Sequence, residues 1–188
     1  MSAGHPPGAT VRAALALLAR HRRPAYLAAL AATLVNSVPD VARQLLVLDD
    51  PRVGAALAVD AVGFATGLLA QLWVTGAVAG LAARGAPSWS GALRRGTALA
   101  GGALRRAPAA VAAGVVLGGV VSALLTVPAS VAALGADGVL GPLGSPGAGA
   151  FAVATASDVV ASVVTLPFLA FVLVVAAGDR FAARPGGQ

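Results

Sequence analysis

The polar residues that could carry chemistry in this chain stand inside long apolar segments. Asp60 and Asp158 each interrupt a stretch that holds no other charge, and Gln71 and Asn36 place amide groups in similar surroundings. A carboxylate inside a membrane span costs about 2.5–3.5 kcal/mol at the bilayer centre and less near the interface, so it usually has a partner or a task. We therefore take these four residues as candidate functional residues, with the two acids as candidate cation- or proton-binding groups.

A structural interpretation of the same residues stays open. Each apolar segment carries a polar stripe, and polar groups are costly against lipid, so the stripes should converge inside a bundle. Hydrogen bonds between membrane helices contribute about 0.6 kcal/mol each. Arg43 and Arg52 are the expected ion-pair partners of the acids, and such pairing would make Asp60 and Asp158 structural.

Signals for catalysis and for metal or cofactor binding are weak. His5 and His21 are the only histidines, both near the N-terminus, and there is no cysteine. We find no metal-ligand spacing, nucleophile elbow, phosphate-binding loop or dinucleotide fingerprint. The sequence therefore predicts no catalytic residue, no cofactor and no metal site, and we do not expect an enzyme.

The segments that must position these residues are typical of membrane helices. Of the 188 residues, 58% are hydrophobic and 11% are charged, whereas soluble domains carry about 25% charge. A span needs about 20 mostly apolar residues. Residues 54–83, 111–134 and 149–177 satisfy this length, while residues 24–39 are short unless the helix continues through Asp40 and Arg43 to Leu48. Because no small-residue cleavage site follows residues 24–39, we read them as a retained first span.

Arginine placement predicts the orientation. Eleven arginines precede the first span, lie between the second and third, or follow the fourth, against only Arg43 and Arg52 on the other side. The positive-inside rule makes the arginine-rich side cytoplasmic, with both termini there. The absence of lysine suits GC-rich coding, and we expect a multi-pass protein of a bacterial plasma membrane. The same positions argue against a nucleic-acid partner.

Residues 88–106 predict a helix lying in the membrane interface. At 100° per residue, Trp89, Leu93, Ala100 and Leu104 share one face, and arginines occupy the other, which is typical of interfacial helices. The expected membrane anchors, which would contact anionic headgroups at the cytoplasmic face, are Trp89, Arg94, Arg95, Arg105 and Arg106. Residues 10–23 show a weaker version of this pattern.

The chain is organised as two similar halves. Each half has a basic amphipathic segment, then a proline, then a span that holds Val-Pro near its end, then a second span ending in Ala-Ala-Arg. This order predicts an internal parallel repeat about an axis near the membrane normal. The expected division of residues 1–188, a single membrane domain, is a disordered 1–9, half one 10–86, half two 87–184 and a tail 185–188.

Three Gly-x-x-x-Gly pairs predict close helix contacts. They are Gly63/Gly67, Gly76/Gly80 and Gly114/Gly118. Such pairs let helix backbones approach, within one chain or toward a second copy or another membrane protein. The first two pairs point to opposite sides of the second span, which we therefore expect to sit centrally.

The layout resembles a known kind of membrane domain. Residues 14–24 lead into the first span, and Ala82-Ala83-Arg84-Gly85 leads to Pro87-Ser88-Trp89. This order of interfacial elbow, span and span resembles the membrane domain of glycerophosphodiester phosphodiesterase-type proteins and related bacterial multi-pass families. Those families usually have more spans, and this chain has no phosphodiesterase domain. The resemblance implies an accessory role and carries over no catalytic residue.

The sequence thus predicts an all-α polytopic bundle of four transmembrane helices plus one or two interfacial amphipathic helices. The leading functional hypothesis is a non-enzymatic accessory or scaffold protein. The alternative is a small transporter or channel-like protein that uses Asp60 and Asp158, and a membrane-bound enzyme acting on lipid-linked substrates comes third.

Overall fold

The described chain is entirely helical. The computed structural model describes residues 6–47, 53–81, 89–140 and 147–178, and no strand occurs among them. The helices there are α1 (Pro7–Arg20), α2 (Arg22–Val47), α3 (Val53–Leu81), α4 (Trp89–Arg106), α5 (Pro108–Leu140) and α6 (Ala148–Ala176). The expected all-α class is therefore confirmed.

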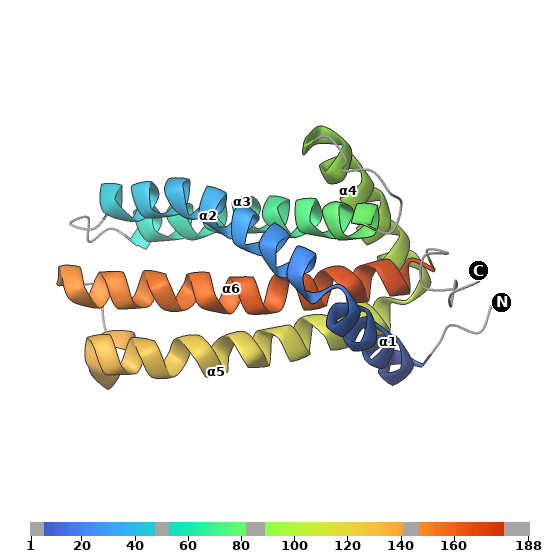
Figure 1. The fold of residues 1–188 in the computed structure, drawn as a ribbon. Helices are drawn as coiled ribbons and strands as arrows, with labels where there is room; N and C mark the ends of the chain where they lie inside the picture. The colour runs from blue at the N-terminus through green and yellow to red at the C-terminus, as the bar shows by residue number, and fades with distance from the viewer. Residues whose placement is uncertain (1–5, 48–52, 82–88, 141–146, 179–188) are drawn as a thin grey trace.

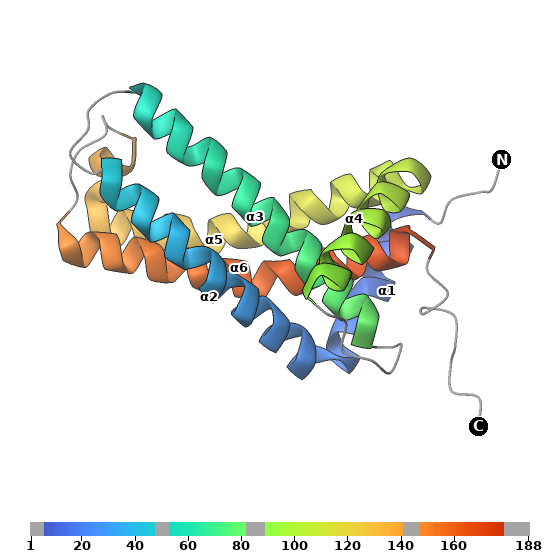
Figure 2. The same ribbon diagram turned by 90° about the horizontal axis from the view of Figure 1, so that it is seen from above.

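The four long helices run side by side, and the two short ones lie at one end of the molecule. In Figure 1, α2 and α3 form an upper layer, α6 lies beneath them, and α5 lies on the other side of α6. Helices α1 and α4 lie at the end where α6 finishes (Figures 1 and 2). Since α1, the start of α2 and α4 carry arginines, that end gathers most of the positive charge of the described chain.

Prolines and glycines explain several helix boundaries. Helix α1 begins at Pro7 and helix α5 begins at Pro108. The first residue of a helix has no carbonyl partner for its N–H within that helix, so proline, which lacks this N–H, is well tolerated there. Helix α2 continues through Pro39 to Val47, as the longer version of the first span requires. Gly135 adopts φ 75°, so α5 changes direction there and a short helical segment follows to Leu140, within a stretch expected to be a loop. Helix α1 begins inside the segment expected to be disordered, because Pro7 presets its first turn.

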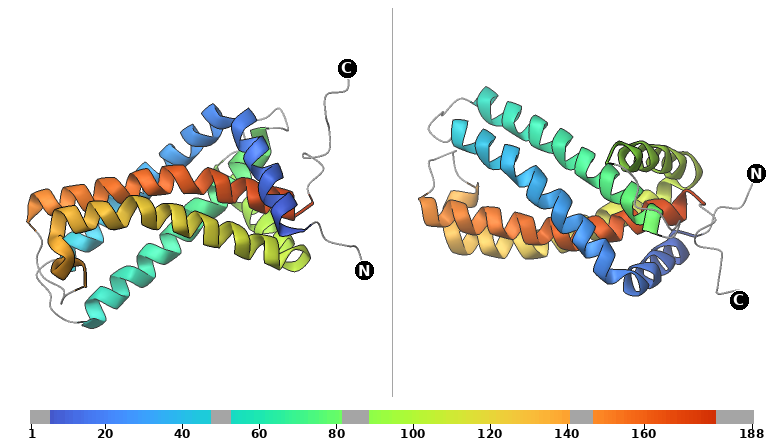
Figure 3. Two further views of the ribbon diagram at one scale, coloured as in Figure 1. Left: turned by 90° about the horizontal axis from the view of Figure 1, so that it is seen from below. Right: turned by 45° about the horizontal axis from the view of Figure 1, so that its top comes forward.

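The core surrounds the C-terminal half of α6. That half is almost completely buried, with Ala170 and Val172 at 0% exposure. Small residues of α1 and α2, such as Ala14 and Ala25, pack against it together with Val74 of α3. Helix α6 contacts every other helix of the described chain. Helix α6 therefore takes the central position that we expected for the second span, which is α3 in the structure. Helices α2 and α3, helix α5 and both short helices all lie against α6 (Figure 3).

Two glycines set the closest helix crossing. A Cβ atom on Gly76 of α3 would overlap the carbonyl oxygen of Ala92 and lie 2.9 Å from the nitrogen of Gly96. A Cβ atom on Gly96 would likewise overlap the carbonyl oxygen of Leu72. The backbones of α3 and α4 touch here, which only glycine permits. Gly76 therefore serves a contact with a short helix rather than with another long one.

The other glycine pairs include one glycine that makes a close helix contact and two that do not. A Cβ atom on Gly114 would lie 2.8 Å from Cγ1 of Val172, so this glycine does bring α5 close to α6. Gly67 and Gly118 have no heavy atom within 4 Å of a built Cβ atom. These two glycines therefore make no close helix contact within the described part of the chain, and their contact with a second copy or another membrane protein stays a prediction.

Three helices are long and apolar enough to cross a membrane. These segments are Leu57–Gly80, Pro108–Ala133 and Gly149–Ala176, within the residues that the structure describes. Their surfaces support this reading, since large apolar side chains such as Phe64 (76% exposed) and Leu124 (69% exposed) point outward. Soluble monomers rarely expose such extended apolar surface. The chain is thus a helical bundle of membrane-spanning character.

Candidate functional site

Gln71 connects α3 to the central helix. Its side chain is buried at 8% exposure, and its Nε2 donates to the carbonyl oxygen of Leu166 at 3.4 Å and to Oγ1 of Thr75 at 3.3 Å. Leu166 immediately precedes Pro167, which is fully buried and cannot donate to the preceding turn of α6. Gln71 therefore makes a hydrogen bond between α3 and α6, next to the proline inside α6. This bond is the role that the structural interpretation of the polar residues gives to Gln71.

The polar residues Thr33, Asn36 and Ser37 of α2 face inward only in part. Thr33 is buried at 5% exposure, and its Oγ1 has no hydrogen-bond partner among the described residues. Ser37 donates to the carbonyl oxygen of Thr33 at 2.8 Å. Asn36 is half-buried and lines an apolar cleft described below. The amide of Asn36 is thus the polar group of this stripe that faces an open space.

Of the two acids, Asp158 is the one whose side chain the structure describes. Asp158 lies on the exposed surface of α6, so the expectation that its stripe converges wholly inside the bundle is wrong. The outer half of α6 has fewer helices around it than the inner half, which leaves this face open. The side chains of Asp60 and Arg43, and the whole of Arg52, lie outside the described residues, so the expected ion pairs are not described.

The expected membrane anchors divide into two groups. Arg94 and Arg95 are exposed on α4. Arg105 is also exposed, and its Nε donates to the carbonyl oxygen of Gly101 in its own helix at 3.1 Å. Arg106 instead reaches the end of α6, where its Nη1 donates to the carbonyl oxygen of Ala177. A cation at a helix C-terminus satisfies carbonyls that have no helical partner, so Arg106 caps α6.

Helix α4 buries its small residues rather than its large ones. Ala92, Gly96 and Ala103 are buried, whereas Leu104 is 56% exposed. The close crossing with α3 selects this face, because only small side chains fit between touching backbones. Of the predicted apolar face, Leu104 is therefore left to face outward and Leu93 lines a cleft. The side chain of Trp89 lies outside the described residues.

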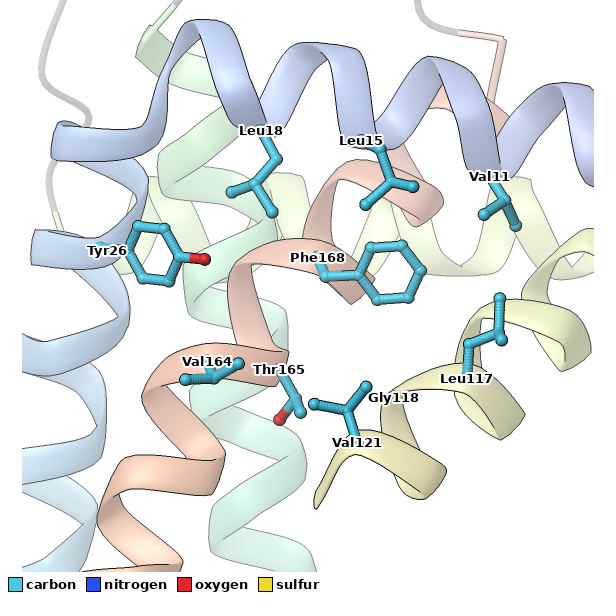
Figure 4. Close-up of a pocket in the computed structure, with 10 residues that line it drawn as sticks. All are labelled: Val11, Leu15, Leu18, Tyr26, Leu117, Gly118, Val121, Val164, Thr165 and Phe168. Carbon is cyan, nitrogen blue, oxygen red and sulfur yellow. The ribbon is translucent and has the colours of Figure 1, made fainter. Parts of the chain in front are cut away.

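A first apolar cleft lies beneath α1. It encloses about 330 Å³, near the lower end of the range for small-molecule pockets, about 300–1,000 Å³. Figure 4 shows Val11, Leu15 and Leu18 pointing from α1 toward Phe168 of α6. The remaining wall comes from α5 and from the ring of Tyr26, whose hydroxyl is one of two polar groups in the lining. All lining residues are Val11, Leu15, Leu18, Tyr26, Leu117, Gly118, Val121, Val164, Thr165 and Phe168.

A second apolar cleft lies between α2, α3 and α4. It encloses about 240 Å³. Leu93 covers one end from α4, and Trp73 contributes the largest ring. Its lining residues are Ala32, Val35, Asn36, Thr66, Leu69, Ala70, Trp73 and Leu93. Asn36 and Thr66 give this cleft two polar groups, so both clefts are largely apolar with a few hydroxyl or amide groups.

The two clefts are built in a similar way. The first is lined by α1, α5 and α6 together with Tyr26 of α2, and the second is lined by α4, α2 and α3. Within the long helices, Thr165 and Phe168 line the first cleft, as Thr66 and Leu69 line the second at the same spacing. Each short helix thus forms one wall of a cleft between long helices.

The clefts were not foreseen from the sequence. Val11, Leu15 and Leu18 form a recognisable apolar face, yet nothing in the sequence says which helices that face covers. His21 likewise packs inward, with its ring stacked on that of Phe171 at a centroid distance of 6.4 Å, a contact that no sequence pattern predicts. No group of three or more potential metal-ligating residues occurs among the described residues.

Comparisons with family models, with curated proteins and with solved structures gave no match for this chain.

Proposed function

We propose that this chain is a four-span integral protein of the bacterial plasma membrane that acts as a non-enzymatic accessory or scaffold protein. The observation that carries the proposal is the outward-facing belt of aliphatic side chains on the long helices, which ends at two arginine-bearing short helices. Lipid is the solvent that such a belt requires. The elbow-span-span layout that resembles phosphodiesterase-type membrane domains supports an accessory role of this kind.

Helix α2 is the proposed fourth span. Its outward face is apolar, with Leu27 64% exposed, Leu34 53% exposed and Val38 73% exposed. It runs alongside α3 from the arginine-rich end to the opposite end (Figure 1). A helix with this surface and length would be poorly solvated in water. With α2 crossing, α1 and α4 lie in the same interface, and the positive-inside rule makes that interface cytoplasmic.

The internal repeat is part of the proposal. The described helices follow the order short, long, long twice. Contact of α1 with α6 corresponds to contact of α4 with α3, and the pairs α2–α3 and α5–α6 also correspond. These matching contacts support two copies of one unit related by an axis near the membrane normal.

Topology labelling tests the four-span arrangement. The chain has no cysteine, so single cysteines at Ala16, Ala98 and Gly149 can be labelled with a membrane-impermeant maleimide. These positions are all exposed. We expect Ala16→Cys and Ala98→Cys to react from the cytoplasmic side and Gly149→Cys from the other. If α2 did not cross, Ala16→Cys would react from the side of Gly149→Cys.

The transporter alternative has a separate test. Gln71 is engaged between helices and both clefts are largely apolar, so the described residues offer no continuous polar route across the bundle. In proteoliposomes, we therefore expect dissipation of proton, sodium and potassium gradients to match that of protein-free vesicles. A gradient loss that disappears in an Asp60→Asn/Asp158→Asn variant would favour transport over a scaffold role.

A further inference from the structure

We propose that the two clefts are binding sites for anionic phospholipids, each holding part of an acyl chain while a neighbouring arginine pair holds the phosphate. This inference rests on the proposed function, because it needs the long helices to span the membrane. It names the partner that the short helices recognise.

The clefts lie at acyl-chain depth. Leu117 and Val121 stand about 14 and 20 Å along α5 from its start at Pro108, at 1.5 Å per residue. Ala32 and Asn36 stand about 15 and 21 Å along α2 from its start at Arg22. One leaflet is about 20–22 Å thick when its headgroup region is included. Measured from helix starts at headgroup level, both clefts therefore lie in the deeper part of the leaflet that adjoins the arginine-rich end and reach to about the bilayer midplane.

The lining suits a flexible aliphatic chain. Leu15, Leu117 and Val121 are partly exposed at the first cleft, and Val35 and Leu69 are partly exposed at the second. These side chains surround open volumes of about 330 and 240 Å³. A water-filled volume bounded mainly by carbon would be unfavourable in a bilayer, and a lipid chain is the apolar molecule present at this depth.

The arginine pair beside each cleft, at the start of α2 or on α4, has no acidic residue near it along the chain. Arg22 and Arg23 lie one turn before Tyr26, and Arg94 and Arg95 directly follow Leu93. All four arginines are exposed. No acidic residue occurs in residues 1–39 or 61–136, so none is available on α1, the first part of α2, or α4. A guanidinium group binds phosphate well, often through two hydrogen bonds. The missing counter-charge therefore points to a phospholipid phosphate with a net negative headgroup.

Fluorescence of Trp73 tests the second cleft. The chain has two tryptophans, so Trp89→Phe leaves Trp73, which lines the cleft, as the only one. The protein is placed in nanodiscs of phosphatidylcholine that contain brominated phosphatidylglycerol or, separately, brominated phosphatidylcholine. We expect the anionic lipid to quench Trp73 with several-fold higher apparent affinity, and each arginine to contribute roughly fivefold.

Matched variants separate a site from general contact with lipid. Arg94→Gln should lower the anionic preference, whereas Arg105→Gln, an equal charge change at the far end of α4, should not. Ala70→Phe fills the cleft and should reduce quenching, whereas Ala65→Phe on the exposed face of α3 should leave it unchanged. Equal quenching by both lipids, or equal effects of the paired variants, would overturn the proposal for this cleft.

Neighbouring glycines test the first cleft. Gly118 lines it and Gly119 does not, and a Cβ atom on either meets nothing within 4 Å. Gly118→Leu should remove one retained anionic lipid in native mass spectrometry without changing Trp73 quenching, while Gly119→Leu should remove none. Identical lipid counts for the two variants would overturn this site. Labelling that placed Ala16 and Ala98 on opposite sides would instead overturn the four-span function itself.

Discussion

Replacing Gly76 with alanine should separate α3 from α4. The new Cβ atom would overlap the carbonyl oxygen of Ala92 and lie 2.9 Å from the nitrogen of Gly96. Both colliding atoms belong to a helix backbone, so no side-chain rotation can relieve the contact. The helices must move apart, and the buried residues around the crossing then lose neighbours that they contact now.

The expected loss of stability is large for the addition of one methyl group. Overpacking a well-packed interior typically costs about 1–3 kcal/mol, and the upper part of that range applies where only backbone can yield. A loss of about 2–3 kcal/mol lowers the folding equilibrium constant roughly 30- to 150-fold. Once the helices have separated, a second methyl group at Gly96 meets less resistance. The double variant should therefore cost less than the sum of the single ones.

Unfolding by sodium dodecyl sulfate in mixed micelles measures this loss, followed by the fluorescence of Trp73 and Trp89. Gly67→Ala is the matched control, because it lies on the same helix and its Cβ atom would meet no heavy atom within 4 Å. We expect the control to stay within about 0.5 kcal/mol of the unchanged protein. If Gly76→Ala unfolded at the same detergent fraction as Gly67→Ala, the backbones of α3 and α4 would not be in contact and the reasoning would be refuted.

Three further substitutions test individual contacts by the same unfolding measurement. Gln71→Leu removes the bond to the carbonyl oxygen of Leu166 and should cost about 0.6 kcal/mol, and no more than about 1.7 kcal/mol; an unchanged transition would contradict the bond. Thr33→Val replaces a buried hydroxyl that has no described partner, so stability should stay equal or rise by up to about 1 kcal/mol. A clear loss would reveal a partner for that hydroxyl. Arg106→Gln removes the cap of α6 and should cost about 1 kcal/mol, whereas an equal loss in Arg105→Gln would refute a specific cap.

Helix formation was largely predictable because it depends on local patterns. A span must satisfy its backbone groups internally, so a long apolar run can only be a helix in a membrane. The second and fourth expected spans accordingly match α3 and α6 to within a few residues. The first span was ambiguous, since Pro39 could end or bend a helix, and the structure carries the helix on to Val47.

The roles of individual side chains were less predictable. Gln71 was correctly placed on an inward stripe, but its partner is a backbone carbonyl of α6, and sequence patterns carry no information on such pairs. Asp158 was expected inside the bundle and lies on its surface. The burial of this side chain depends on how many helices surround that part of α6, which the sequence of α6 does not specify. Arg106 is exposed, as an interfacial anchor requires, but its bond to the end of α6 spans 71 residues of the chain and no sequence pattern predicts it.

The sequence by itself determined that this chain is a helical protein of membrane-spanning character with its arginines near the helix ends. Those properties follow from composition and from spacing along one helix, which need no knowledge of neighbours. Only the tertiary structure decided that α6 is central, that α1 lies across α5 and α6 while α4 lies across α3, and that the faces of these short helices cover two apolar clefts. These features depend on which surfaces meet in space, and many small-residue faces in this chain could have met equally well. The candidate site therefore arises from packing; of the residues that first suggested chemistry, Asn36 lines one cleft, whereas Asp158 lines neither.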